Sequence, residues 1–250
     1  MQNYGISKGT INNLKLNMIP ILLYHKVSPP KECNSLPHLN VKPETFKNHL
    51  HWLKDMGYHG IRLSDAVDIV KSGKKPDEKL IVLTFDDGYK NNFDYAFPIG
   101  KELGFPLTIF ISTNFIGSSL SFGAQKGDQI LNKEELITLV KEGSEIGSHT
   151  CSHPKLSEID EESALKELID SKNILSEIVR KEVGTLAYPK GSYNQNILKL
   201  AEKAGYKCAC TTKKGNRFSI NDLMKLPRVK IHEDTTKMRL RFRLSVFYNI

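Results

Sequence analysis

The sequence lacks several features that define common classes of protein. It has four cysteines in 250 residues, too few and too scattered for a disulfide framework. No apolar run approaches the roughly 20 residues that a membrane-spanning helix needs. Residues 1–17 contain no apolar stretch of the kind that a secretory signal carries. Together these absences predict a cytoplasmic protein.

Basic charge is present without a motif that would give it a specific partner. The formal net charge of +8 favours anionic partners weakly. No nucleic-acid recognition motif occurs, and aromatic residues are not interleaved with basic ones. A lysine-rich, solvated surface explains the charge equally well, so we expect no nucleic-acid partner. Nothing in the sequence indicates an oligomeric state.

Two of the cysteines alternate with an alanine in a strand-like stretch. Cys208 and Cys210 flank Ala209, so their thiols should point the same way. A metal site there would need more ligands nearby, and none are adjacent. We therefore expect reduced thiols in the core, where free cysteine behaves as a small apolar residue.

Short apolar runs alternate with amphipathic helical patterns along the chain, which predicts βαβ units and a parallel sheet. One helix should end near Gly57 and a long one should begin near Asp160. Seven strands of this kind either form an open sheet or close into a barrel, and periodicity does not decide between them. In both cases ligands bind at the carboxyl ends of the strands. The predicted strands are Ile19–His25, Leu80–Phe85, Leu107–Ser112, Glu145–Ser148, Gly184–Tyr188, Tyr206–Thr212 and Leu226–Ile231.

Polar clusters follow several of these strands. Asp86 and Asp87 end a buried strand, where two adjacent carboxylates are costly unless something cationic neutralises them. An Asx turn with Gly88 is the simple alternative. After another strand come His149 and His153, four residues apart, which would share one face of a helix.

Two histidines and a carboxylate with an open position form the ligand set of catalytic zinc. We therefore predict that Asp87, His149 and His153 bind the metal. Such a metal lowers the pKa of its water towards about 7, and Asp86 would take the proton as general base. His25, at the end of the first predicted strand, would be a general acid or a buried histidine bonded to a backbone carbonyl.

These residues resemble the motifs of the polysaccharide deacetylases, carbohydrate esterase family 4. Thr84–Gly88 resembles the family's first motif, which supplies the base and a metal ligand, and His149–His153 resembles the second, which supplies two histidine ligands. The resemblance runs from about Ile19 to the mid-230s. It implies a single-domain, distorted (β/α)7 barrel of mostly parallel strands, usually with zinc, acting on N-acetylated sugars. The deacetylase domain would span residues 18–236, between an N-terminal extension, 1–17, and a C-terminal element, 237–250.

The chain departs from the family pattern in its third motif. An arginine that orients the catalytic aspartate is common there, whereas this chain has Ala187. Tyr188–Gly191 resembles a variant of the motif in which the amide of Lys190 contacts the oxyanion. Another group must then orient Asp86, and Arg228 is the candidate.

Two further departures concern the methyl pocket and the general acid. The family's tryptophan-containing motif has no counterpart, because the only tryptophan is Trp52 in an early helix. The LxxH motif that supplies the acid is not clear near the C-terminus. Leu22–His25 resembles it moved to the front, as in a branch similar to the poly-N-acetylglucosamine deacetylases. His232, after the last predicted strand, is the competing candidate.

The sequence thus predicts a metal-dependent hydrolase that removes N-acetyl groups from a saccharide, with Zn²⁺, or Co²⁺ or Ni²⁺, as cofactor. The alternative is a carbohydrate-binding protein that keeps the fold without the activity. A magnesium-dependent hydrolase or phosphotransferase is disfavoured because magnesium prefers all-oxygen sites.

The C-terminal stretch carries conflicting periods. Apolar and basic residues alternate between Met238 and Leu244, as in a strand, but Leu240, Leu244 and Phe247 also fit a helix. The simple interpretation is a final element packed on the barrel with its arginines in solvent. The alternative is a basic, apolar surface that associates with a membrane or an anionic saccharide carrier.

Overall fold

The computed structural model describes residues 19–33, 36–74, 76–118 and 128–245. Its main sheet contains β1 and β4–β10, all paired in parallel. A separate two-stranded sheet joins β2 to β3. The strands are β1 Ile21–Tyr24, β2 Lys26–Val27, β3 Asn40–Val41, β4 Tyr58–Ile61, β5 Lys79–Phe85, β6 Leu107–Ile111, β7 Glu145–Ser148, β8 Thr185–Ala187, β9 Cys208–Lys214 and β10 Leu226–Lys230.

The sheet closes into a seven-stranded parallel barrel. β1 pairs with β10 and also with β5, where Leu22 lies opposite Leu83. The ring therefore runs β1-β5-β6-β7-β8-β9-β10 and returns to β1. This confirms the fold class and decides between the open sheet and the barrel. β4 was not predicted, and it pairs with the first half of β5 outside the ring.

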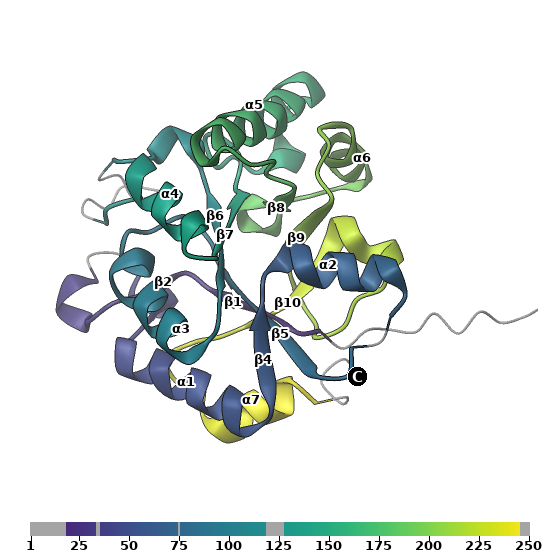
Figure 1. The fold of residues 1–250 in the computed structure, drawn as a ribbon. Coiled ribbons are helices and arrows are strands. Elements are labelled where there is room, and N and C mark those ends of the chain that lie inside the picture. Colours follow the sequence, from purple (N-terminus) through teal and green to yellow (C-terminus); the bar gives the residue numbers. More distant parts are fainter. Residues whose placement is uncertain (1–18, 34–35, 75, 119–127, 246–250) are drawn as a thin grey trace, which may run out of the picture.

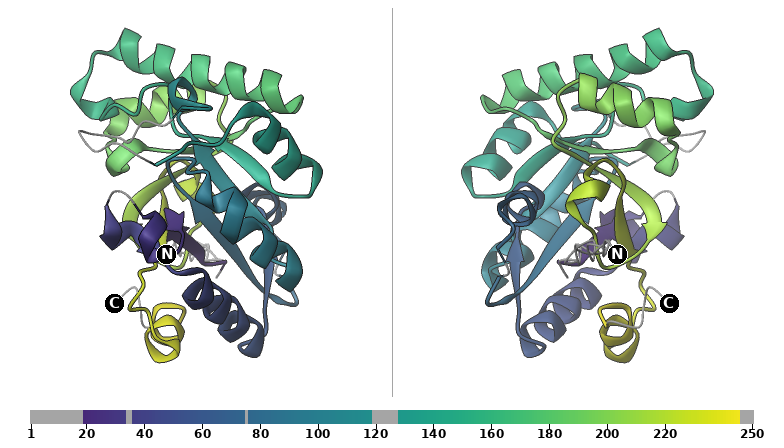
Figure 2. Two further views of the ribbon diagram at one scale, coloured as in Figure 1. Left: turned by 90° about the vertical axis from the view of Figure 1, so that its left-hand side faces the viewer. Right: turned by 90° about the vertical axis from the view of Figure 1, so that its right-hand side faces the viewer.

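Helices surround the barrel (Figure 1). Both views in Figure 2 show α5 and α6 together at one end of the molecule and α1 with α7 at the other. The α-helices are α1 Pro43–Asp55, α2 Leu63–Ser72, α3 Phe97–Leu103, α4 Lys133–Lys141, α5 Glu161–Val179, α6 Gln195–Lys203 and α7 Lys237–Arg243. Shorter turns are the 3-10 segments Pro30–Glu32, Pro37–Leu39, Thr113–Phe115, Leu156–Glu158, Pro189–Gly191 and Ile220–Lys225, and a π-helical segment, Asn92–Ala96.

Local chemistry explains where the helices begin and end. The side chain of Asp160 accepts a hydrogen bond from Ser163 N and caps α5, as the sequence predicts. Asn194 caps α6 in the same way, through Ile197 N. After α1 the chain turns at Gly57, whose φ of 78° suits a residue without a Cβ atom.

Alternate residues of β5 pack into different clusters, and this sets up the site. Ile81, Leu83 and Phe85 pack with residues of α1 and α4. Leu80 and Val82 pack instead with residues of α2 and with the two thiols, Cys208 and Cys210. Both thiols are free and fully buried, which confirms them as core residues. Because strand residues alternate, Thr84 and Asp86 continue on the side of Val82.

The C-terminal element is a helix, not a strand. In α7, Leu240 is fully buried and Leu244 follows it at 3% exposure, whereas Met238 is 81% exposed. The predicted packing on the barrel is therefore correct. The predicted docking surface stays a prediction, and Phe247 lies outside the described residues. Within the described ranges, no helix combines the length and the apolar character needed to cross a bilayer.

Candidate active site

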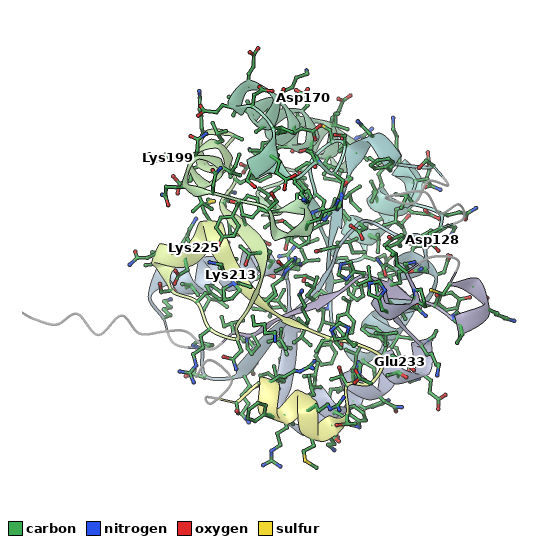
Figure 3. The ribbon with its side chains drawn as sticks, turned by 180° about the vertical axis from the view of Figure 1, so that it is seen from behind. Asp128, Asp170, Lys199, Lys213, Lys225 and Glu233 are labelled. Carbon is green, nitrogen blue, oxygen red and sulfur yellow. The ribbon has the colours of Figure 1, made fainter. Side chains whose placement is uncertain are left out.

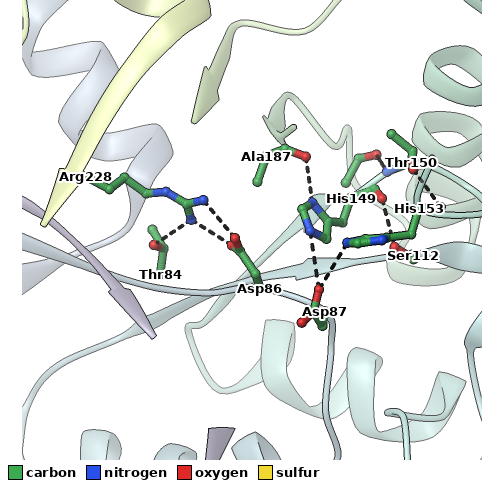
Figure 4. Close-up of polar contacts among 10 residues, drawn as sticks. Thr84, Asp86, Asp87, Ser112, His149, Thr150, His153, Ala187 and Arg228 are labelled. Atoms are coloured by element: carbon green, nitrogen blue, oxygen red, sulfur yellow. Dashed lines mark hydrogen bonds and ion pairs between the residues drawn. The ribbon is translucent and has the colours of Figure 1, made fainter. Parts of the chain in front are cut away.

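The predicted site residues gather at the carboxyl ends of neighbouring strands. Asp86 and Asp87 follow β5, His149 follows β7, and His25 follows β1. Figure 4 shows the two adjacent carboxylates turned towards different partners, Asp86 towards Arg228 of β10 and Asp87 towards the two histidines. The rule that ligands bind at strand carboxyl ends therefore holds for this barrel.

Asp87, His149 and His153 converge on one point. Asp87 Oδ1 lies 3.4 Å from His149 Nε2 and 3.4 Å from His153 Nε2. The ligand atoms of the three residues all lie within 4.8 Å of one another. Two ligands about 2.0–2.2 Å from a tetrahedral cation are separated by about 3.3–3.6 Å. The spacing and the nitrogen and oxygen donors therefore fit a zinc-like metal.

A backbone carbonyl fixes the tautomer of His149. Its Nδ1 lies 2.6 Å from Ala187 O, which can only accept, so Nδ1 carries the hydrogen. Nε2 faces Asp87 and is the ring nitrogen that would bind a metal. Such an outer contact orients a histidine and raises its basicity towards a metal. Ala187, which stands where the family pattern has arginine, thus serves the site through its carbonyl.

The histidine pair lies on a loop, so the predicted shared helical face is wrong. Thr150 and His153 have φ values of 68° and 61°, in the left-handed region. Glu167 of α5 holds the loop, because its Oε2 accepts from the amides of Cys151 and Ser152 at 2.7 and 2.9 Å. His153 N donates to Thr150 Oγ1 at 3.1 Å. These contacts bring the two rings to 4.9 Å between centroids.

Backbone strain is concentrated around this point. Six non-glycine residues in the described chain have positive φ, and four of them belong to the site: Asp87, Thr150, His153 and Lys190. Positive φ at a residue with a Cβ atom costs energy and persists where the surroundings enforce it. The positive φ of Asp87, directly after β5, turns its carboxylate away from that of Asp86. The two adjacent residues can therefore contact different partners, Asp86 the arginine and Asp87 the histidines.

Arg228 forms a bidentate ion pair with Asp86 through both terminal nitrogens of its guanidinium group. Nη1 lies 2.7 Å from Oδ1 and Nη2 lies 2.8 Å from Oδ2. Nη1 also donates to Thr84 Oγ1, and Nε donates to Thr211 O. Arg228 is fully buried and Asp86 is 3% exposed. The sequence predicts this contact, and the geometry has the bidentate form that fixes a carboxylate most strongly.

The surrounding charges keep both carboxylates ionised. Burial alone would raise the pKa of Asp86, but Arg228 outweighs burial and holds that pKa below its usual value. Burial opposes ionisation of Asp87 too, yet His149 and His153 together lower its pKa strongly. Two ionised carboxylates at one buried point attract cations.

Of the two candidate acids, His25 lies beside the carboxylates. Burial lowers the pKa of His25, while the charges of Asp87 and Asp86 act in the opposite direction. His232 lies in a turn whose next carboxylate, Glu233, accepts from Lys42 N at 2.8 Å. Asp86 N donates to the carbonyl oxygen of Tyr24, the residue before His25, at 3.1 Å, so the end of β1 lies beside the carboxylates.

The third predicted segment forms a tight turn after β8. Lys190 has φ 56°, and the amides of Gly191 and Ser192 bond to Tyr188 O and Pro189 O. Lys190 is close enough to His153 to lower its pKa through charge. Trp52, by contrast, lies in α1, with its ring 5.5 Å from that of His49. It packs against the core.

Sequence reasoning missed three supporting groups: Thr84, Glu167 and the carbonyl of Ala187. Thr84 could have been noticed, because it is the one polar residue within the apolar run Leu80–Phe85. Its hydroxyl donates to Leu22 O at 2.6 Å and accepts from Arg228. Glu167 sits on a helix with other glutamates, and nothing in its spacing sets it apart. A backbone carbonyl leaves no mark on the sequence.

Comparison with known proteins gives a consistent result. Residues 73–209 match the family described as polysaccharide deacetylase. The chain is 32% identical over 213 residues to YxkH of Bacillus subtilis (strain 168), covering 85% of this chain and 71% of that one. It is 27% identical over 240 residues to the poly-β-1,6-N-acetyl-D-glucosamine N-deacetylase of Staphylococcus aureus (strain MSSA476), covering 88% and 81%.

Among solved structures, the deacetylase PplD of Streptococcus pyogenes, in complex with acetate, superposes with a TM-score of 0.79. It is 26% identical, and the match covers 91% of this chain and 98% of that one. IcaB from Ammonifex degensii, at 20% identity, shares the fold with a TM-score of 0.76.

Proposed function

This chain belongs to the polysaccharide deacetylase family, and from that premise we propose that it is a metal-dependent hydrolase of N-acetylated amino sugars. The observation that carries the proposal is the convergence of Asp87, His149 and His153 beside an ionised Asp86. The relatives in Staphylococcus aureus and Streptococcus pyogenes are both named as deacetylases, and the second was solved with acetate, the acid that such a reaction releases.

Asp87, His149 and His153 would hold the metal, with Zn²⁺ as the first choice and Co²⁺ or Ni²⁺ as alternatives. Imidazole donors favour these cations over magnesium. When bound, the cation would supply Lewis-acid activation of the carbonyl and of water. Ala187 O and Glu167 support the ligands by fixing the ring of His149 and the loop to His153.

Asp86 would act as the general base. Arg228 holds its two oxygens, so the carboxylate has one orientation and stays ionised. Asp86 takes a proton from the attacking water as the new carbon–oxygen bond forms at the acetyl carbon. The amide of Lys190, in the turn after β8, is the proposed contact for the negative oxygen.

His25 would complete the reaction as general acid. The carbon–nitrogen bond breaks, His25 donates a proton to the leaving nitrogen, and acetate and a free amine result. A low pKa makes a histidine a stronger acid, and burial lowers the pKa of this ring. The charges of the neighbouring Asp87 and Asp86 act in the opposite direction.

An acetate-release screen tests the proposal. Metal-stripped protein receives Zn²⁺, Co²⁺ or Ni²⁺ and is offered chitin-like oligomers, poly-N-acetylglucosamine, peptidoglycan fragments and nucleotide-linked or lipid-linked sugars. We expect metal-dependent release of acetate from at least one class. Saccharide binding without acetate release from any of them would favour a carbohydrate-binding protein instead.

A further inference from the structure

We propose that the saccharide bound at this site carries a negative charge, a carboxylate or a phosphate, near the N-acetylated sugar, and that Lys213 together with Lys190 binds it. The inference rests on the proposed function and adds the chemical class of the substrate. Its basis is a basic stretch of the rim formed by the turn after β8 and the end of β9, defined here as Lys190, Tyr193 and Lys213.

This basic stretch is continuous with the metal site. Lys190 lies three residues after Ala187, whose carbonyl oxygen accepts from Nδ1 of the proposed metal ligand His149 at 2.6 Å. Gly191 lies against Thr212, and a Cβ atom built on it would come within 2.1 Å of Thr212 Oγ1. The turn that carries Lys190 is thus pressed onto the residue preceding Lys213.

The same turn is tied to the loop beyond the metal ligands. Ser192 Oγ lies 2.7 Å from Ser157 Oγ, and Ser157 N also donates to Ser192 Oγ, at 3.3 Å. The loop after β7, the turn after β8 and the end of β9 therefore form one connected part of the rim. A chain of sugars that places its acetamide at the metal site would extend along it.

Lys213 is exposed but held in place by an aromatic ring. Its Nζ lies 5.4 Å from the ring centroid of Tyr193. Tyr193 in turn stacks on Tyr188, with 5.4 Å between ring centroids, and the Tyr188 hydroxyl donates to Met224 O. A lysine restrained by a neutral ring keeps its whole charge. It also loses less freedom when an anion binds, which is the advantage of a preorganised contact.

Three lysines that follow β1, β5 and β7 are neutralised. Lys26 after β1 pairs with Asp128 at 2.6 Å, Lys90 after β5 pairs with Asp94 and Glu135, and Lys155 after β7 pairs with Glu158. In the part of the chain that the structure describes, Lys190 and Lys213 lie within ion-pair distance of no carboxylate. Figure 3 shows Lys213 and Asp128 on opposite sides of the molecule. Lys190 and Lys213 therefore leave positive charge on the side of β8 and β9, where it would attract an anion.

Matched substrates test the inference on the full-length, metal-loaded protein. The three arms are short N-acetylglucosamine oligomers, oligomers of the same length that contain N-acetylmuramic acid, and oligomers of the same length with a terminal phosphate. We expect kcat/KM for acetate release to be on the order of tenfold higher for at least one anionic arm, the scale of a charge-assisted contact near the surface. A preference for one anionic arm identifies the carboxylate or the phosphate as the source of the charge.

Two variants and a control assign the effect to this stretch. Lys213→Gln should reduce the anionic-to-neutral ratio of kcat/KM on the order of tenfold, mainly through KM. Tyr193→Leu keeps the charge of Lys213 but removes the ring that restrains it. It should therefore lower the anionic-to-neutral ratio of kcat/KM by less than Lys213→Gln does. Lys199→Gln, which removes an exposed lysine on α6, should leave the ratio unchanged. Added salt should lower the ratio in the parent protein and much less in Lys213→Gln.

Equal rates on neutral and anionic oligomers, or an equal loss on all three arms in Lys213→Gln, would overturn the inference and leave deacetylation standing. Absence of acetate release from every arm, with the metal bound, would refute the proposed function, and the inference would fall with it.

Discussion

The two ends of the barrel both hold carboxylates, buried at one end and half-buried at the other, and surround them with different partners. At the carboxyl end of the strands, Asp86 is held by the guanidinium of Arg228 and Asp87 by two imidazoles. At the amino end, Glu145, the first residue of β7, accepts only from neutral donors. These are Ser64 N, Ser64 Oγ, Thr108 Oγ1 and Thr185 Oγ1.

The difference sets the charge of each group. Burial raises the pKa of Glu145, and its neutral donors offset that effect only in part. At the other end, the guanidinium of Arg228 and the imidazoles of His149 and His153 reverse the effect of burial and keep the two aspartates ionised. Glu145 accepts a hydrogen bond from the backbone N–H of Ser64, in the first turn of α2. The N-cap residue of α2 makes no side-chain hydrogen bond, so Glu145 caps the helix in its place. One end is thus equipped for chemistry, and the other holds the barrel together.

Separating the roles of the adjacent aspartates should give the largest effect. Asp86→Asn should reduce acetate release by about 10²–10⁴-fold, because it removes the proton acceptor, and leave one metal per chain bound. Asp87→Asn should lose activity and metal together. Turnover with metal analysis of the purified variants measures both, and equal metal loss in the two would mean that the roles are assigned wrongly.

The choice of general acid is the next test of the catalytic end. His25→Ala should lower kcat by about 10²–10⁴-fold and flatten one limb of the pH–rate profile, because the leaving nitrogen loses its proton donor. His232→Ala should keep that limb. If instead His232→Ala removes it and His25→Ala does not, the acid is His232 and the motif is not moved to the front.

Arg228 links catalysis to stability at the same end. Arg228→Gln leaves Asp86 buried without its cation and should cost about 3–5 kcal/mol of folding free energy. Arg228→Lys should recover part of the loss, because a lysine keeps the charge but not the two-armed contact. Denaturant unfolding and kcat measure the two effects, and a change in neither would show that the ion pair does not support the site.

Glu145→Gln should give the smallest effect, on stability and not on chemistry. The substitution replaces one carboxylate oxygen, which accepts hydrogen bonds, by an amide NH2 group, which cannot. Loss of that acceptor should cost about 1–3 kcal/mol of folding free energy. Metal content and kcat should stay unchanged. The pKa of Glu145 is raised above 4.5 on folding, so the native state binds more protons than the unfolded state above that pH. Its contribution to stability is therefore present at low pH and lost as pH rises through the raised pKa.

A glutamine side chain does not titrate, so the Glu145→Gln variant should lack this pH dependence of stability. Unfolding midpoints measured from pH 4 to 8 should show the cost of Glu145→Gln shrinking as pH rises. A cost that grows with pH would mean that Glu145 is stabilised as a carboxylate, and the contrast between the two ends would be lost.

Much of this arrangement could be predicted from the sequence, because buried strands and strand-end polar residues leave strong patterns. The apolar run that precedes Asp86 and Asp87 placed both at a strand end, and the departure from the family's third motif made Arg228 the candidate partner of Asp86. The closure of the barrel followed from the resemblance and not from periodicity, since it depends on the pairing of β1 with β5, 61 residues apart along the chain. Spacing also suggested a helix for His149 and His153, whereas left-handed residues and Glu167 shape a loop.

A crystal of the zinc-loaded protein, measured at the zinc absorption edge, tests the central claim most directly. The account predicts one anomalous peak between β5 and β7, about 2.0–2.2 Å from Asp87 Oδ1, His149 Nε2 and His153 Nε2. It also predicts no peak there in crystals of Asp87→Asn with His153→Ala. A zinc ion bound elsewhere in the parent protein, with these three side chains uncoordinated, would contradict it.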